Sequence, residues 1–485
     1  MTSNKIITWL RNLIQQKRPS ACRSLHDWYQ NQADLPRFVR QSPVAERYLR
    51  LLGPLAWHQF PERELRLYGQ SEPIPYAPFV AACLIKLDQQ IVSMSGLRDY
   101  LIQHPELLWL LGFTTRPDRS TPWGFDPEAS LPTARHFTRM LRTIPNQVLQ
   151  FLLDSTITLL QQELAEVGLS LGQSISLDTK HILAWVVENN PKAYVPESQR
   201  LDKTRQPKGD RHCKLGCKRK RNRPPLKEQG QPETPTKNPR PPTNFSPKDE
   251  YFWGYGSGVA SSKVPDWGEF VLAELTQTFD HDDLTYFFPL LNQVERRLGH
   301  KPPSGACDAA FDAFYVYEYF HRAGGFAAVP FVARGGFRRV FDPDGLPLCQ
   351  AGLPMPLKST YRCKTTLVEH ERGRYGCPLL LPEPSGQTCP INHNQWSKGG
   401  CISTMPTSIG ARLRYQLDRT SDQYKTLYTQ RTASERINAQ AKALGIERPK
   451  LRNQQAIANL NTLIYVLINL RAFHRIRQQK TSPIL

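Results

Sequence analysis

The sequence predicts an α/β protein that begins with an all-helical region. Apolar residues recur at helical spacing from about residue 40 to residue 167. Residues 173–333 then alternate short apolar strands with helical segments, and helical spacing returns after residue 426. A chain of 485 residues can bury a large core, so we expect two or three domains.

The first predicted domain, residues 1–170, consists of helices. Pro78 suits a first helical turn, and Gly168 suits the position after a last turn. A plain helical bundle explains this region, and the alternative is a bundle whose exposed basic residues contact a polyanion, namely Arg135, Arg139 and Arg142. Helices are expected at residues 46–57, 78–91, 94–102, 105–111, 133–144 and 147–167.

The second predicted unit, residues 171–334, holds two aspartates near strand ends. Ile175 and Leu177 alternate with serines in a half-buried strand that ends on Asp178. A later buried strand ends close to Asp308, and an isolated aspartate at such a place commonly caps a helix. Further elements are strands at 251–260, 270–275, 303–308 and 327–333, and helices at 283–299 and 311–323, the last with Asp312 on its surface.

A basic insertion at residues 189–250 interrupts this unit. Between residues 199 and 248 there are fifteen lysines or arginines, four acidic residues and nine prolines. So few apolar residues predict a disordered or loosely held loop. The loop would contact phosphate non-specifically or serve as a solubilising linker, and its densest basic run is Lys218, Arg219, Lys220 and Arg221. Three possible metal ligands without an evident fourth are His212, Cys213 and Cys217.

Residues 335–425 form a loop-rich insertion that contains five cysteines. No CxxC pair occurs, and the gaps of thirteen, thirteen, eleven and eleven residues are wide for a small zinc module. Buried reduced thiols in turns are the expected alternative, together with some β-structure. The cysteines are Cys349, Cys363, Cys377, Cys389 and Cys401.

Charge and composition limit the class of partner. The formal charge of +20 favours nucleic acid over a membrane surface. No run of about 18 apolar residues occurs, so no transmembrane helix is expected. The amphipathic stretch Met1–Ser20 lacks the apolar core and cleavage site of a signal peptide. We therefore expect a cytoplasmic protein, whose ten cysteines are reduced or bind metal rather than form disulfides.

The last unit, residues 426–485, begins with a polar helix. Arg431, Glu435 and Lys442 would lie near one another on one helical face, close to Tyr428. Glutamate binds Mg²⁺ while arginine and lysine contact phosphate oxygens, so this face suits a site where a metal meets a phosphate. The alternative is a solvated helix with ordinary ion pairs. The opposite, core-facing positions are Ala433, Ile437, Ala441 and Leu444, and a final helix over 453–471 would present one apolar face to the core.

The spacing Tyr428, Arg431, Glu435, Lys442 resembles the Y-R-E-K signature of bacterial insertion-sequence DDE transposases. This resemblance implies an RNase H-like mixed sheet flanked by helices, in which the first and fourth strands are adjacent and parallel. The catalytic, metal-binding carboxylates would be Asp178, Asp308 and Glu435. Residues 78–139 also resemble the helical region that binds DNA ends in such enzymes, and residues 344–363 resemble an insertion near their active site.

The resemblance further implies metal-dependent cleavage of DNA at the element ends and strand transfer into target DNA. Two Mg²⁺ or Mn²⁺ ions would be held, with Asp178 bridging them and the other two carboxylates each completing one. Tyr428, Arg431 and Lys442 would grip the DNA backbone. The expected partners are double-stranded DNA, both element ends and target, and a second copy of the chain on paired ends, in the nucleoid-associated cytoplasm of a prokaryote.

Three rival functions stay open at this point. A nuclease on the same fold would share the three carboxylates and cut DNA without joining it. A catalytically inactive DNA-binding relative would tolerate the loss of one carboxylate. A zinc-dependent regulator would depend only on the scattered cysteines and histidines.

Overall fold

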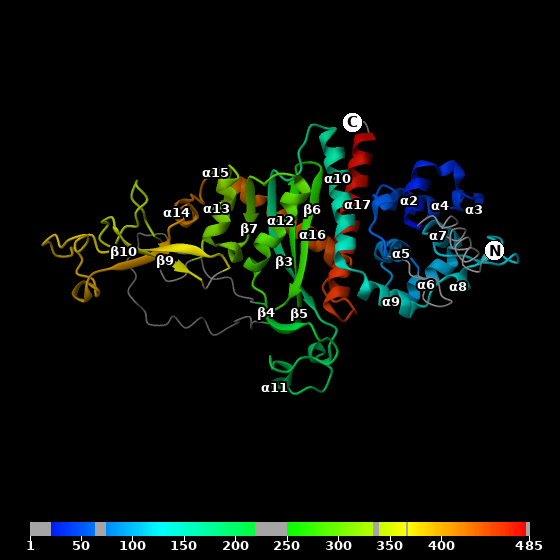
Figure 1. Cartoon of the computed structure of the whole chain (residues 1–485), viewed down its shortest axis with the longest axis horizontal. Coiled ribbons are helices and arrows are strands. Elements are labelled where there is room, and N and C mark those ends of the chain that lie inside the picture. The colour runs from blue at the N-terminus through cyan, green and yellow to red at the C-terminus, as the bar shows by residue number, and fades with distance from the viewer. Residues whose placement is uncertain (1–20, 64–73, 219–249, 333–338, 365–366, 482–485) are drawn as a thin grey trace, which may run out of the picture.

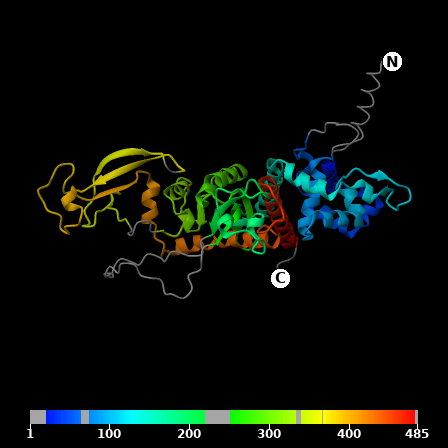
Figure 2. The same cartoon turned by 90° about the horizontal axis from the view of Figure 1, so that it is seen from below.

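The protein has a mixed α/β structure in the computed structural model, which confirms the predicted class at that level. The structure describes residues 21–63, 74–218, 250–332, 339–364 and 367–481. Helices occupy one end of the molecule, a sheet with its flanking helices lies in the middle, and a smaller part with its own strands lies at the other end (Figure 1; Figure 2). The predicted segment Met1–Ser20 and the residues Arg219, Lys220 and Arg221 lie outside the described residues.

Local signals define the N-terminal helices. Ser42, Ser93 and Thr133 each accept a backbone N–H from the first turn of the helix that follows. The helices predicted for this region are present with shifted ends, and Gly168 follows the last of them with φ +73°. The elements are α2 (Ala21–Gln30), α3 (Arg37–Arg40), α4 (Pro43–Leu52), α5 (Tyr76–Asp88), α6 (Met94–Gln103), α7 (Pro105–Leu110), β1 (Arg116–Pro117), β2 (Phe125–Asp126), α8 (Pro127–Ser130), α9 (Ala134–Thr143) and α10 (Asn146–Ala165).

The central sheet has the strand order β4-β5-β3-β7-β8, with β6 also paired to β5. Strand β5 is antiparallel to β3, β4 and β6, whereas β3 is parallel to β7 and β7 is parallel to β8. The predicted parallel pairing of the strands that carry the two aspartates is therefore confirmed. The strands are β3 (Ser174–Leu183), β4 (Lys214–Lys218), β5 (Glu250–Val264), β6 (Gly268–Thr278), β7 (Ser304–Cys307) and β8 (Ala327–Ala328).

Most strand boundaries differ from the prediction, and two of the differences are large. Asp178 does not end its strand, because β3 continues to Leu183 and its second half pairs with residues 254–258 of β5. The strand predicted at 327–333 is only the pair Ala327–Ala328. Pairing with a partner strand, which a single segment cannot reveal, sets both of these lengths.

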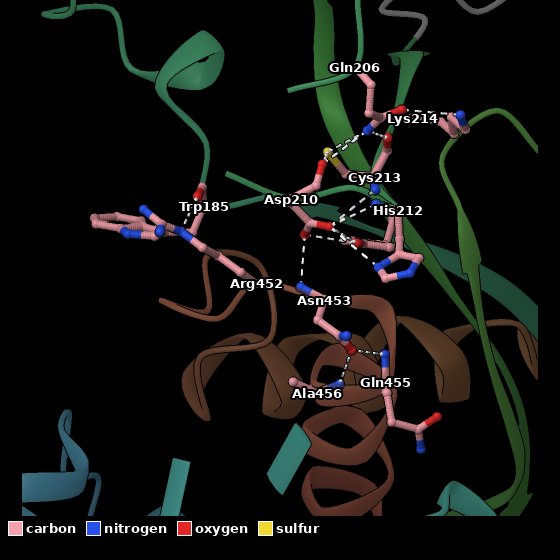
Figure 3. A network of polar contacts seen from close by, with 11 residues as sticks. Trp185, Gln206, Asp210, His212, Cys213, Lys214, Arg452, Asn453, Gln455 and Ala456 are labelled. Carbon is pink, nitrogen blue, oxygen red and sulfur yellow. Dashed lines mark hydrogen bonds and ion pairs between the residues drawn. The ribbon is translucent and has the colours of Figure 1, made fainter. Parts of the chain in front are cut away.

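Residues 189–218, the described part of the predicted insertion, consist mainly of turns and two short regular elements. The segment contains α11 (Glu197–Arg200) and strand β4, and it is fixed by the buried carboxylate of Asp210. That carboxylate accepts the Tyr255 hydroxyl at 2.8 Å and the backbone N–H of Asn453 at 3.1 Å (Figure 3). Buried hydrogen bonds at Asp210, together with the burial of Cys213 and Leu215 in the main core, hold this segment against the sheet. Residues 219–249 of the insertion lie outside the described part.

The longest helix, α17 (Gln454–Thr481), is a core helix. The predicted apolar face packs in the core, with Ile457, Ile464 and Leu467 buried, and burial extends to nearly all sides of the helix between Asn459 and Leu470. It is long and apolar enough to cross a membrane by length and composition, but 83% of the relevant window is buried inside the protein. Helix α10 lies along it (Figure 1), and Lys480 near its end contacts Glu163 of α10 at 2.6 Å.

Helices close the core around the sheet. The turn η4 (Asp283–Tyr286) leads into α12 (Phe287–Leu298), and η5 (Ala309–Phe311) follows β7. Asp312 is not on a helix surface: its side chain is 1% exposed and pairs with Arg414 at 2.5 Å. Its carboxylate accepts hydrogen bonds from the Arg414 guanidinium and from the backbone N–H of Val332, both of which lie farther along the chain. The later elements are α13 (Phe314–Arg322), α14 (Ile409–Gln416), α15 (Asp422–Thr429) and α16 (Thr432–Ala443).

The insertion before the last helices contains the predicted β-structure. Strands β9 (Leu357–Cys363), β10 (His370–Gly376) and β11 (Ile402–Pro406) form an antiparallel sheet with β10 in the middle. This sheet lies at the end of the molecule opposite the N-terminal helices (Figure 2).

Candidate active site

Two predicted site residues emerge side by side from the parallel strands β3 and β7. Leu177 on β3 pairs in register with Cys307 on β7. Asp178 and Asp308, the residues that come next, therefore lie at the same level along the two strands. Both residues are half-buried, and the charge of Asp178 contributes to the raised pKa of Asp308. The structure therefore brings these two predicted carboxylates together.

Asp308 has an unfavourable environment for its charge. Burial, together with the nearby carboxylates of Asp283 and Asp178, raises its pKa to about 6. A hydrogen bond from the Ala310 N–H at 2.9 Å and the charge of Arg431 oppose this rise. The hydrogen bond from the Ala310 N–H makes Asp308 the cap of the short helix η5. The same side chain can therefore cap a helix and belong to the candidate site.

Asp178 is better supplied with donors. One of its oxygens accepts the Thr179 N–H at 2.9 Å, and the other accepts the side-chain amide of Asn438 at 2.8 Å. Burial nevertheless raises its pKa, against these two bonds and the charge of Arg431, while Asp283 adds to the rise. Two backbone or amide donors and one guanidinium thus only partly compensate the desolvation of this carboxylate.

Asp283 is a functional candidate that the sequence reasoning missed. It lies in η4, and its carboxylate accepts the Thr179 hydroxyl at 2.6 Å. Its charge raises the pKa of both Asp178 and Asp308. At Asp308 it raises the pKa more than the charge of Asp178 does. The sequence shows only an acidic residue at the start of a helix, which is a common position, and the packing of η4 against η5 gives it its place.

The signature segment forms two helices rather than one. Helix α15 ends at Thr429 and α16 begins at Thr432, with Arg431 in between. The predicted core positions Ala433, Ile437, Ala441 and Leu444 are buried. The break at the start of α16 lets Arg431 lie over the Tyr428 ring, 5.7 Å from its centroid.

Arg431 connects the three predicted carboxylates. It pairs with Glu435 at 2.5 Å, and its charge lowers the pKa of Asp178 and of Asp308 against the larger effect of burial. The Glu435 side chain is 48% exposed. Arg431 is thus paired with Glu435 and also acts through its charge on both strand aspartates.

Asn438, three residues after Glu435 on α16, is a second residue that the sequence reasoning missed. Its side-chain amide donates to Asp178, and its Oδ1 atom is buried without a partner. The residue is only 6% exposed. The signal was available in the sequence, because positions three apart share a helical face.

The remaining predicted contacts lie farther out. Lys442 is 64% exposed and pairs with Glu447 at 3.4 Å, so it does not join the Arg431–Glu435 pair. Lys218 is exposed at the end of β4. A cavity of about 720 Å³ is lined by Glu274 and His212 but by none of the three predicted carboxylates. Within the described part of the chain, no group of three or more His, Cys, Asp or Glu side chains is arranged to hold a metal ion.

Comparisons with known proteins add little. No protein-family model matches the chain, and no curated protein matches it. Among solved structures, a piggyBac transposase synaptic complex with hairpin DNA is similar at a TM-score of 0.28 and 9% identity, over 84% of this chain and 73% of that chain. A likeness this weak carries no argument about fold or function.

Proposed function

We propose that the chain is a DDE transposase, which cuts DNA at the ends of an insertion sequence and joins the freed ends to target DNA. The strand order β6-β5-β3-β7-β8, antiparallel in its first three strands and parallel between β3 and β7, supports an RNase H-like catalytic core. The observation that carries the proposal is the meeting of Asp178 and Asp308 with the face of α16 that bears Glu435 and Asn438.

The donors at this site fit Mg²⁺ or Mn²⁺. The carboxylate of Asp178 raises the pKa of Asp308, and the Oδ1 atom of Asn438 is buried without a hydrogen-bond partner, so the site offers the oxygen donors that these cations prefer. When bound, two such ions would activate the attacking oxygen and stabilise the leaving oxygen of a phosphodiester. Asp178 would contact both ions, and Asp308 and Glu435 one each.

Arg431 would change partners in the loaded site. In the structure its guanidinium pairs with Glu435 and partly neutralises the aspartates. Once Glu435 turns to a ligand role, the guanidinium is free to donate to a DNA phosphate, while the Tyr428 ring keeps it in place. Lys442, with its exposed ammonium group, would contact the same strand.

The proposed partner is double-stranded DNA, and the proposed assembly is a homodimer on paired element ends in the prokaryotic cytoplasm. The formal charge of +20 supports a polyanionic partner. Lys218 and the basic residues Arg219, Lys220 and Arg221 would add non-specific phosphate contacts, which weaken as salt concentration rises.

The test is cleavage of labelled DNA that carries the sequences flanking this gene, with Mn²⁺ or Mg²⁺. We expect metal-dependent nicking that is lost in Glu435→Gln, while DNA binding persists. Glu447→Gln is the matched control, because Glu447 is also an ion-paired glutamate close to α16 and would keep activity.

The products separate the rivals. Joined DNA products support transposition, and cut but unjoined DNA would indicate a nuclease on the same fold. If Glu435→Gln cut as well as the natural protein, the assignment of Glu435 would be wrong. If both proteins bound DNA and neither cut it, an inactive DNA-binding relative would be the better explanation.

A further inference from the structure

Four of the five cysteines in the insertion gather at one place, which we call the thiol group: Cys349, Cys377, Cys389 and Cys401. Cys377 and Cys389 are buried in one small cluster, and Cys401 packs against it. Cys401 also packs against the neighbouring cluster, as does Cys349. Gly400, the residue before Cys401, lies directly against Cys377, because a Cβ atom on it would stand 3.3 Å from the Cys377 Sγ.

The backbone presents these thiols from tight turns. The carbonyl oxygens of Cys349, Cys377 and Cys389 each accept the N–H of the residue three positions later, at 3.0, 3.1 and 3.1 Å. Each of these three cysteines is therefore the first residue of a hydrogen-bonded turn, which fixes the backbone beside it.

The fourth cysteine is brought in by glycines. Cys401 follows Gly399 and Gly400, whose φ angles are +95° and +84°, a conformation that other residues rarely adopt. A Cβ atom on Gly400 would stand 2.6 Å from the Cβ of Cys377. Only glycine at this position lets the chain segments of Cys377 and Cys401 approach so closely.

The segment between β10 and β11 has too little apolar core to hold itself. Residues 377–401, all of which the structure describes, contain one 3-10 turn, Trp396–Lys398. The buried residues of its cluster are Cys377, Leu379 and Cys389. A fold of this size usually needs a disulfide or a metal to fix it.

We propose that Cys349, Cys377, Cys389 and Cys401 bind one structural zinc ion. Zn²⁺ takes four thiolates in a tetrahedral arrangement, and binding releases their protons to solvent. No group of three such side chains in the described residues is already arranged as a metal site, so the thiols must turn about their Cα–Cβ bonds to bind. The site is separate from the acidic site and does not depend on the proposed function.

Two nearby side chains are excluded from the ligand set. Cys363 lies on β9 opposite His370 and is in neither of the clusters that contain the other four cysteines. His393 accepts the Gln395 N–H on its Nδ1 at 3.0 Å, which leaves its proton on Nε2 and no free lone pair there. In the sequence the five cysteines are almost evenly spaced. Spacing alone therefore does not show that Cys363 is the one that lies outside the site.

The first measurement is the zinc content of the full chain, purified without added metal or chelator. We expect about one zinc per chain, and we expect four thiols to resist alkylation until a strong chelator is added. A natural protein with no zinc and no protected thiols would overturn the proposal, and so would a Cys377–Cys401 disulfide found by mass spectrometry under non-reducing conditions.

Variants then identify the ligands. Cys377→Ser and Cys389→Ser should each lower the zinc content at least fivefold, whereas Cys363→Ser, the matched control from the same insertion, should keep it. Glu435→Gln should also keep its zinc, which separates this site from the proposed transposase chemistry. Full zinc content in Cys377→Ser would contradict the proposal. Because serine variants can misfold, Co²⁺ added to the zinc-stripped natural protein gives a second test, and absence of the absorption of a tetrahedral thiolate complex would also contradict it.

Discussion

Asp210 is a buried aspartate and Asp308 is a half-buried one beside the same sheet, and their surroundings differ. Asp210 accepts the Tyr255 hydroxyl and the N–H groups of His212, Cys213 and Asn453 (Figure 3). Asp308 accepts one backbone N–H and faces two other carboxylates. A buried carboxylate surrounded by donors holds the fold together, whereas one surrounded by like charges lowers stability and is ready to bind a cation.

The substitution Asp210→Asn tests this comparison most directly. The substitution keeps the side-chain size but replaces an accepting oxygen with an NH₂ group that faces other donors. We expect the free energy of unfolding to fall by about 3 kcal/mol, since a buried network of charge-assisted hydrogen bonds is lost. Urea denaturation of both proteins at pH 7.5 measures this, and an unchanged midpoint would mean that residues 189–218 are held by other contacts.

The same substitution at the second site should have the opposite effect. Asp308→Asn retains the cap on the Ala310 N–H but removes a charge that burial and two carboxylates disfavour. For metal-free protein at pH 7.5 we expect a gain of about 1–2 kcal/mol in unfolding free energy. Calorimetry in the presence of a chelator tests this, and a loss of stability would show that Asp308 is a structural carboxylate like Asp210.

The pH dependence sharpens the contrast. The pKa of Asp308 is raised to about 6 in the folded protein, above its value of 3.8 in the unfolded chain. The folded state therefore holds an extra proton between these values, so stability falls as pH rises from about 4 to 6, and the loss stays constant above that range. The difference in stability between Asp308→Asn and the natural, metal-free protein should grow over this window. Urea midpoints at pH 4.5 and 7.5 measure it, and an equal difference at both values would contradict the raised pKa.

The smallest effect on stability is expected outside both sites, at Lys442. Its ion pair with Glu447 is exposed, so Lys442→Ala should change the unfolding free energy by less than about 0.5 kcal/mol. If Lys442 contacts phosphate, however, the slope of log affinity against log salt should decrease by about one. DNA binding measured at several salt concentrations tests this, and an unchanged slope would exclude a phosphate contact.

Much of the fold follows from local sequence patterns. Caps such as Ser42, Ser93 and Thr133 fix helix starts through bonds to residues three positions away, and alternating residues fix the strands. The motif spacing identified the segment of Arg431 and Glu435, and these two do form a pair. All these signals lie within one or two turns of chain, so a single sequence displays them.

Other features depend on contacts between distant segments. Asp283 joins the acidic site because η4 packs on η5, and Asn438 joins it through Asp178. Asp312 is buried by Arg414, which lies about a hundred residues later in the chain. None of these partners is marked by composition or spacing.

The sequence by itself therefore determined most of the longer helices and most of the strands. Only the tertiary structure decided which carboxylates share that site, that Asp210 orders residues 189–218, and which four cysteines gather. The physical reason is that local hydrogen bonding and apolar periodicity act within a few residues, whereas burial and electrostatic interactions depend on which segments the folded chain brings together.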